Sequence, residues 1–332
     1  MDSAFDKRAG PSFDRGMTLQ ITDVPLDHLG FLRRSAAQKA GVSDDQLASA
    51  VRHGDLIRLA PGVYMLPLDP AFAITESGKD EQYRLTCLAR ASTPRVGTAP
   101  LSHQSAAAVH RLPMLTPDRG LVHAIRGGPG GSARRGGRFR HAGTVPDGDI
   151  VVVDGVRVTS LPRTAVEVAA TGTFAQALTV VDAAMRRGVT RDELTAALAG
   201  RRPEGVRVAR RAIEHGNGLS ESPGESWSRA QMLDADLPLP VLQRKYTLEG
   251  HVQRPDFDWL GRVVGEFDGE VKYQGVLQPG EDPRQALIRE KEREDRFRRA
   301  GIHVVRWTWS MLVKGTMIPA LIGWLRRTGV MA

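Results

Sequence analysis

The residues in this sequence best suited to chemistry are four acidic side chains close together near the C-terminal end. Asp256, Asp258, Glu266 and Asp268 lie in the stretch RPDFDWLGRVVGEFDGEVKY. A spacing of two residues places both carboxylates of each pair on one face of a β-strand, and Leu260-Gly261 supplies a turn between the two strands. We therefore expect the four carboxylates to converge.

Repulsion among these carboxylates favours a bound divalent cation. Oxygen ligands from Asp and Glu suit Mg²⁺ or Mn²⁺, and the sequence has no clustered Cys and His set that would favour Zn²⁺. Such an ion polarises a phosphoryl oxygen and makes hydroxide available near neutral pH, which predicts phosphodiester hydrolysis. Lys272 lies near enough to meet a phosphate or to help deprotonate a water. Acid-x-acid strands also occur as solvent-facing sheet edges, so spacing alone leaves that alternative open.

Composition agrees with a polyanionic partner. The 332 residues include 46 Lys plus Arg and 38 Asp plus Glu, a net charge of +8. This length suits two or three domains, and a 41% hydrophobic fraction can fill their cores. A single Cys87 and the lack of any run of about 20 apolar residues exclude disulfide-rich and membrane-spanning classes. We expect a cytoplasmic protein whose residues 1–20 form a disordered tail, although composition does not separate DNA from RNA or a membrane surface.

Residues 21–70 are predicted to form a winged helix-turn-helix. Leu29, Leu32 and Ala36 share one face of a first helix, and Ser43 with Gln46 forms a capping box for a second helix. The stretch LIRLAPGVYML then alternates around a Pro-Gly turn like a two-stranded wing.

Such a fold places one helix in the major groove of DNA and the wing over the adjacent backbone. The expected phosphate contacts are Arg33, Arg34, Lys39, Arg52 and Arg58, and the expected base contacts are Gln46 and Ser49. Asp44 and Asp45 begin the second helix, where they suit its dipole but repel phosphate. A protein-interaction module of the same shape is the alternative.

Residues 78–203 are predicted to form a mixed α/β domain without an evident catalytic cluster. His103 and His110, two turns apart on one helix, are interpreted as ordinary structural residues, because no Cys or carboxylate lies nearby in the sequence. The stretch 125–143 is rich in Gly and Arg and has no acid. We predict a flexible basic loop there that either tracks phosphates or is merely solvated, and its DNA-contact candidates are Arg134, Arg135 and Arg138.

Residues 205–332 are predicted to form an α/β domain with a mixed sheet. The expected order is two helices, strands at 241–248, 252–259 and 262–268, a charged helix at 283–300, a strand at 302–309 and a last helix. Arg293 and Arg296 are one turn apart and form a candidate DNA phosphate contact, although a solvated helix face is favoured. Trp307 and Trp309 share a strand face, where a core position is favoured over stacking on bases.

Four blocks of this region, SPGESWSRAQML, RPDFDW, VVGEFDGEVKY and REDRFRRAGIHVVRWTW, resemble in their order the Vsr-related branch of the PD-(D/E)XK nuclease superfamily. The resemblance implies a restriction-endonuclease-like fold with Asp256 as the central metal ligand, Glu266 as the second carboxylate and Glu225 near the metal-bound water. Glu225 also suits the first turn of a helix for electrostatic reasons alone. Lys272 stands where Vsr-like members often have histidine. Asp268 stands where many superfamily members have lysine, as a third metal-facing acid or one that supports the fold.

The upstream blocks LIRLAPGVYML, LSHQSAAAVHRLP and VTSLPRTAVEVAA resemble AbiEi-type abortive-infection antitoxins, which implies a winged-helix N-terminus followed by an α/β domain. Together the patterns predict an α/β multidomain protein that binds duplex DNA and hydrolyses it with Mg²⁺ or Mn²⁺, in DNA repair or in defence against phage and mobile elements. The alternative is an AbiEi-like antitoxin or transcriptional repressor with an inactive nuclease fold and a toxin as partner. A third hypothesis is an enzyme that acts on RNA.

Overall fold

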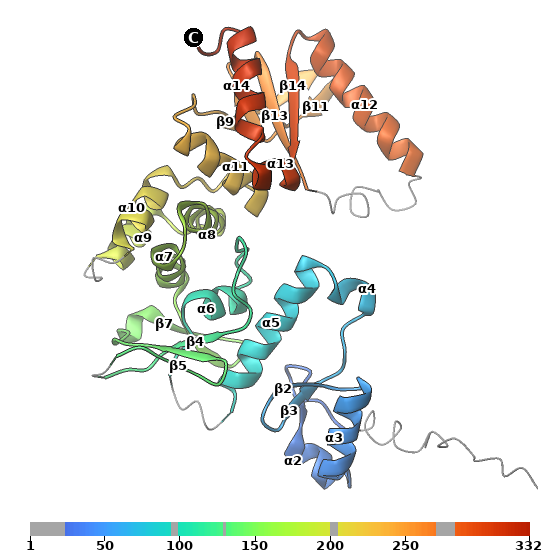
Figure 1. Cartoon of the computed structure of the whole chain (residues 1–332), viewed down its shortest axis with the longest axis vertical. Coiled ribbons are helices and arrows are strands. Elements are labelled where there is room, and N and C mark those ends of the chain that lie inside the picture. Colours follow the sequence, from blue (N-terminus) through green and yellow to red (C-terminus); the bar gives the residue numbers. More distant parts are fainter. Residues whose placement is uncertain (1–23, 94–98, 129–130, 200–204, 270–282) are drawn as a thin grey trace, which may run out of the picture.

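The computed structural model describes residues 24–93, 99–128, 131–199, 205–269 and 283–332. Its elements follow one another along the long axis, with the winged segment at one end and the C-terminal sheet at the other (Figure 1). The predicted tail at 1–20 and Lys272 lie outside the described residues. In the part that is described, no helix combines the length and the apolar character needed to cross a bilayer.

The N-terminal segment has a winged helix-turn-helix architecture, as predicted. Its elements are β1 (Leu32–Arg33), α2 (Arg34–Lys39), α3 (Asp44–His53), β2 (Ile57–Ala60) and β3 (Val63–Met65), and the sheet order is β1-β3-β2. The Ser43–Gln46 capping box is present at the start of α3. Gly54 ends that helix at φ 84°, a left-handed conformation that glycine adopts without strain.

One expectation for this segment was wrong. Leu32 does not lie on the first helix with Ala36 but in β1, where it pairs with Tyr64 of β3. An apolar spacing of three or four residues fits a short strand followed by a helix as well as it fits one helix. Leu32 is buried all the same, because β1 covers the same core as α3.

The winged segment and the next helix share one hydrophobic core. Phe31, Leu59 and Val63 pack in the same cluster as Tyr83 and Leu88 of α5 (Glu76–Ala91), which follows the short α4 (Pro70–Ala73). Burial of apolar surface contributes about 25 cal/mol per Å². The core therefore ties the wing to the middle of the molecule.

The middle of the chain combines two small sheets with helices. The further elements are α6 (His103–Val109), β4 (Val122–Ile125), β5 (Ala133–Arg135), β6 (Arg138–His141), the 3₁₀ turn η2 (Asp147–Asp149), β7 (Ile150–Val153) and β8 (Val156–Thr159). β6 pairs parallel with β4 and antiparallel with β5, and β7 pairs with β8. The prediction of a flexible loop at 125–143 was wrong for residues 133–141, because they form the β5–β6 hairpin with its turn at Gly136 and Gly137.

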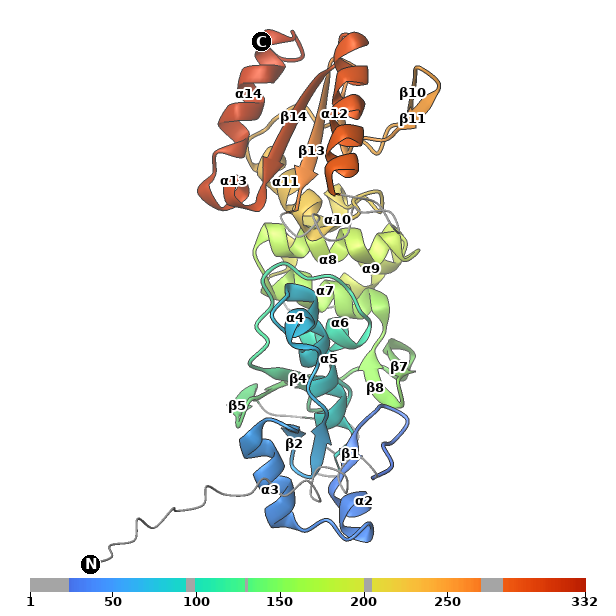
Figure 2. The same ribbon diagram turned by 90° about the vertical axis from the view of Figure 1, so that its right-hand side faces the viewer.

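A group of helices joins this part to the C-terminal sheet (Figure 2). These helices are α7 (Leu161–Thr171), α8 (Phe174–Arg186), α9 (Arg191–Leu198) and α10 (Val206–His215). Their small apolar residues, including Ala165, Ala177, Val181 and Ala209, form a buried cluster that permits close packing. α8 also contacts α11 (Pro223–Asp234), the first helix of the next region.

The C-terminal region contains the predicted mixed sheet, in the order β14-β13-β12-β9. Its strands are β9 (Val241–Leu242), β12 (Phe257–Trp259), β13 (Val263–Asp268) and β14 (His303–Thr308), and its helices after α11 are α12 (Pro283–Arg299), α13 (Trp309–Lys314) and α14 (Met317–Arg327). β13 and β14 run parallel, and the other neighbours run antiparallel. The predicted strands at 241–248 and 252–259 are each broken, because residues 246–248 and 251–253 form a separate hairpin, β10 (Tyr246–Leu248) with β11 (His251–Gln253).

Candidate functional site

The C-terminal ends of α2 and α3, together with the wing, present cations to solvent. Lys39, Arg52 and Arg58 are exposed and form no ion pair with another described residue. Gln46 and Ser49, predicted to read bases, already have partners within α3. Gln46 Oε1 accepts a hydrogen bond from Ser43 N at 2.8 Å, and Ser49 Oγ lies 3.3 Å from His53 Nδ1.

Two of the predicted phosphate contacts are engaged within the protein. Arg33 Nε donates to Asp27 at 2.6 Å and its Nη1 donates to Ser92 Oγ at 2.9 Å, so this side chain links β1 to the end of α5. Arg34 forms a bidentate ion pair with Asp44. The hydrogen bond from Arg34 lowers the pKa of Asp44, so this carboxylate stays ionised, and the Arg34 guanidinium offsets its charge at the start of α3.

The β5–β6 hairpin sorts its arginines onto two faces. Arg135 stands opposite Arg138, whereas Arg134 stands opposite Phe139. Because side chains alternate along a strand, Arg135, Arg138 and Arg140 share one face and Arg134 lies on the other. Arg138 and Arg140 line a shallow hollow together with Arg90 of α5. This face is a concentrated cationic surface.

In the C-terminal region the structure brings together Glu225, Asp256 and Glu266, which we call the acid cluster. Gln243 Nε2 lies 3.3 Å from both Glu225 Oε2 and Asp256 Oδ1 and donates to these two carboxylates. Asp256 Oδ2 accepts a hydrogen bond from Phe267 N at 2.9 Å, which fixes it beside β13. Sequence reasoning missed Gln243, and no pattern around it signals this role.

Glu225 is the most perturbed carboxyl of the acid cluster. It begins α11, where it accepts hydrogen bonds from Glu221 N at 2.8 Å and Ser222 Oγ at 2.7 Å. Burial, together with the charge of Asp256, raises the pKa of Glu225 to about 7. A carboxyl with such a pKa exchanges its proton near neutral pH.

Glu266 is held by two arginines. Arg293 of α12 forms a close ion pair with Glu266 Oε1, and Arg306 Nε of β14 lies 3.2 Å from Oε2. Burial raises the pKa of Glu266, while Arg293 and Arg306 oppose that rise. Arg293, predicted to hold a phosphate, therefore serves this carboxylate. The neighbouring Arg296 is half-buried on α12, and its Nε atom has no hydrogen-bond partner in the described part of the chain.

Asp258 does not join this cluster. Asp258 is fully buried and accepts a hydrogen bond from Tyr246 and one from Arg244 at 3.0 Å, so it anchors the β10 hairpin. Asp268 ends β13 and pairs in register with Thr308. The predicted convergence of four carboxylates was therefore wrong for Asp258, because its partners Tyr246 and Arg244 hold it at the β10 hairpin.

The tryptophan prediction was half right. Trp307 is buried in the core of the sheet, and its Nε1 donates to Ser228 Oγ at 2.7 Å. Trp309 does not continue the strand but begins α13, where it packs edge-on against Phe267 at 5.4 Å between ring centroids. Both side chains stabilise the fold.

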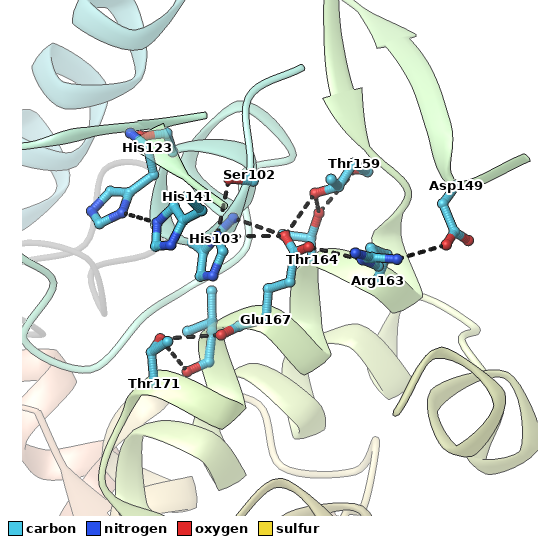
Figure 3. Close-up of polar contacts among 12 residues, drawn as sticks. Ser102, His103, His123, His141, Asp149, Thr159, Arg163, Thr164, Glu167 and Thr171 are labelled. Atoms are coloured by element: carbon cyan, nitrogen blue, oxygen red, sulfur yellow. Dashed lines mark hydrogen bonds and ion pairs between the residues drawn. The ribbon is translucent and has the colours of Figure 1, made fainter. Parts of the chain in front are cut away.

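A second polar cluster, which sequence reasoning missed, lies in the middle of the molecule. His103, His123 and His141, which we call the histidine stack, lie beside the fully buried Glu167 (Figure 3). The rings of His103 and His141 are 3.6 Å apart between centroids and nearly parallel, and His123 Nδ1 lies 2.9 Å from His141 Nε2. His103 lies on a helix, as predicted, and its contact with the other two histidines was not predicted. His110 lies outside the stack, and its Nε2 donates a hydrogen bond to Thr159 O at 2.8 Å.

The architecture at the N-terminus thus has the form of a winged helix-turn-helix regulator. Residues 20–67 match the family model described as "Transcriptional regulator, AbiEi antitoxin", and residues 95–214 match the model described as "AbiEi antitoxin C-terminal domain". The chain therefore carries the N-terminal and C-terminal domains of an AbiEi antitoxin.

Two curated relatives come from Mycobacterium tuberculosis. They are "Uncharacterized protein MT2308" of strain CDC 1551 / Oshkosh and "Uncharacterized protein Rv2248" of strain ATCC 25618 / H37Rv. Each is 34% identical over 159 residues, which cover 46% of this chain and 55% of the relative. The chain thus spans about half the length of the curated relatives it matches. The "Crystal structure of RV2827C protein from Mycobacterium tuberculosis" aligns with 70% of this chain and 87% of its own, at 15% identity and a TM-score of 0.37.

Proposed function

We propose that this protein is a DNA-binding transcriptional regulator of the antitoxin type. The observation that carries the proposal is the set of exposed cations, Lys39, Arg52 and Arg58, on a winged helix-turn-helix whose residues match an AbiEi regulator model. In this proposal α3 enters the major groove and the β2–β3 wing lies over the adjacent backbone. Arg34 screens Asp44, so that the start of α3 can approach phosphates.

The arginines of the β5–β6 hairpin extend this interface in the proposal. Arg135 and Arg138, with Arg140, would contact phosphates outside the site read by α3, and these contacts would be independent of sequence. Arg134 faces away from them. A toxin is the second partner that we propose, because the match at residues 95–214 is to an antitoxin domain.

The test is a mobility-shift titration with duplex DNA from the promoter of the protein's own gene, over a range of salt concentrations. The double variant Arg52→Ala, Arg58→Ala loses two phosphate contacts. We expect the negative slope of log K against log salt to become shallower by about 1.8. The matched control, Arg207→Ala with Arg210→Ala, removes the same charge from exposed positions on α10. A wild-type protein that binds no promoter DNA, or equal slopes for the two double variants, would contradict the proposal.

A second candidate function, which we propose for the C-terminal region, is phosphodiester hydrolysis by a restriction-endonuclease-like domain. Its support is the acid cluster, in which Glu225 and Asp256 share the amide of Gln243 and Glu225 has a pKa of about 7. The mixed sheet is flanked by α11 and α12, and β12 and β13 place Asp256 and Glu266 at one end of it.

The fit of a metal ion can be judged from these residues. The oxygen donors of Asp256 and Glu266 suit Mg²⁺ or Mn²⁺ in type. Their arrangement does not fit, because the two arginines hold Glu266 and no group of three potential ligands among the described residues is placed to bind an ion. Lys272 lies outside the described residues. We therefore derive no hydrolytic step through a metal.

This candidate is tested with Mn²⁺ binding measured by calorimetry and with nicking of supercoiled plasmid. Asp256→Asn abolishes both if the acid cluster is a metal-dependent nuclease site. Asp234→Asn, which removes an exposed carboxylate from α11, leaves both intact. Nicking that survives Asp256→Asn, or Mn²⁺ binding that is absent from the wild type, would count against a nuclease.

A further inference from the structure

The histidine stack joins three elements through ring contacts. His103 begins α6, His123 lies on β4 and His141 lies on β6. Besides the parallel pair of His103 and His141, the rings of His123 and His141 are 5.1 Å apart between centroids, and Phe139 lies 4.4 Å from His141. The stack therefore connects the β5–β6 hairpin, through His141 of β6, to α6.

Hydrogen bonding limits how many protons the stack can hold. The 2.9 Å contact between His123 Nδ1 and His141 Nε2 needs one nitrogen with a proton and one without. If both rings carry a second proton, both nitrogens are donors and the contact becomes repulsive. His123 Nε2 is also buried without a hydrogen-bond partner in the described residues, so a proton bound there is unsatisfied.

Glu167, the carboxylate beside the stack, already has a cationic partner. Glu167 accepts hydrogen bonds from Arg163 Nε at 2.8 Å and from His103 N at 3.1 Å, and Arg163 also pairs with Asp149. One positive charge already lies at this carboxylate. Among the described residues, the charged groups nearest the stack are Glu167, whose Oε2 lies 3.7 Å from His103 Nδ1, Asp118, whose charge acts on His123, and Arg134 on the same face of the hairpin. Arg163, with its partner Asp149 of η2, lies beyond Glu167 from the histidines (Figure 3).

A metal ion explains the geometry less well than protons do. Imidazole binds a metal in the plane of its ring, and the interplanar angle of 9° between His103 and His141, at 3.6 Å, keeps an ion between them out of both planes. No described group of three potential ligands is placed to bind an ion.

His103 also has a φ of 50°, a left-handed conformation that a non-glycine residue adopts at a cost, as is common at functional positions.

We infer that the histidine stack is a proton-sensitive clamp, which holds the β5–β6 hairpin against α6 when its rings are neutral and releases the hairpin when they are protonated. The released element carries Arg135, Arg138 and Arg140. The clamp thus makes the position of this cationic strand pair depend on pH. The inference does not rest on DNA binding by the protein.

Hydrogen exchange of the full chain tests the clamp. Protection factors of the β4 and β6 amides are measured from about pH 8 down to about pH 5.5, the range in which histidine titrates. We expect protection to fall about tenfold or more in these strands, while protection in β13 stays constant. Burial lowers the pKa of His123, which places the fall below the ordinary range of histidine.

Two variants separate the clamp from general acid sensitivity. His141→Gln, or His123→Gln if the first variant is unfolded by circular dichroism at pH 8, loses the pH-dependent fall. His110→Gln, on the same helix but outside the stack, keeps it. The inference is overturned if wild-type protection in β6 is independent of pH, if the stack variants retain the fall, or if Zn²⁺ at pH 8 protects β6 and so identifies a metal site.

Discussion

Asp182 of α8 and Arg229 of α11 form a buried ion pair at 2.5 Å across the junction between the antitoxin domain and the C-terminal region. Asp182 also accepts hydrogen bonds from Ser226 Oγ at 2.8 Å and from Asn217 N at 2.7 Å. Ser226 is the residue after Glu225, so the carboxylate of Asp182 positions the helix that carries one member of the acid cluster.

Removing one member of this pair should be costly. Asp182→Asn leaves the Arg229 guanidinium buried without a charge partner, and we expect the free energy of unfolding to fall by about 3–5 kcal/mol. Chemical denaturation measures this change. The control is Asp234→Ala, which breaks an exposed pair with Arg211 at 2.6 Å and should cost about 1 kcal/mol or less. If the free energy of unfolding falls by a similar amount in the two variants, burial of the Asp182–Arg229 pair does not make its loss more costly.

The raised pKa of Glu225 makes stability depend on pH with a definite sign. The folded protein keeps this proton up to about pH 7, whereas the unfolded chain releases it near the ordinary value of 4.5. The unfolded state therefore binds fewer protons in this interval, and the free energy of unfolding falls as pH rises from about 4.5 to 7, by about 3 kcal/mol in total. Glu225→Gln should remove this slope. Carbon NMR of the carboxyl group checks the midpoint directly, and a midpoint near 4.5 would disprove the prediction.

The two faces of the β5–β6 hairpin should differ in their effect on DNA binding. A double variant Arg135→Ala with Arg140→Ala removes two exposed cations from the cationic face, and we expect the salt slope of DNA affinity to fall by about 1.8. Arg134→Ala removes an equally exposed cation from the opposite face and should leave the slope unchanged. If Arg134→Ala changes the salt dependence of DNA binding as much per charge as the double variant does, both faces of the hairpin contribute equally and the prediction fails.

A methyl group added next to Glu225 should destabilise the C-terminal sheet. A Cβ at Gly224 would lie 2.0 Å from the Phe267 ring, so Gly224→Ala forces the ring or α11 to move, at a cost of about 1–3 kcal/mol. Gly323→Ala is the matched control within α14, where a Cβ meets nothing within 4 Å and alanine should stabilise the helix by about 0.5–1 kcal/mol. Thermal melts of the two variants should shift in opposite directions.

Local signals in the sequence predicted local structure well. The Ser43–Gln46 capping box and the turn of the wing depend on residues within a few positions of one another, and both are present. The mixed C-terminal sheet was also predicted, because apolar runs separated by turn residues indicate strands, although the β10–β11 hairpin breaks two of the expected strands. The β5–β6 hairpin was missed because arginines in short strands have no apolar alternation to reveal them.

The polar clusters were less predictable, because their members come from distant positions. Asp256 and Glu266 were found through their spacing on adjacent strands, whereas Gln243 reaches them from a separate segment with a φ of 54°. His123 and His141 lie on β4 and β6 and meet through the parallel pairing of these strands, whereas His103 reaches them from α6. Only tertiary structure brings such residues together.

The core shared by the wing and α5 has a consequence for how this protein can be divided. Phe31, Leu59 and Val63 are buried against α5, so a cut near residue 70 would expose apolar surface on both fragments. The winged segment therefore cannot be transferred to another protein without α5. The first family match ends at residue 67, but the hydrophobic core continues past that point into α5, so the end of the match is not the end of a folding unit.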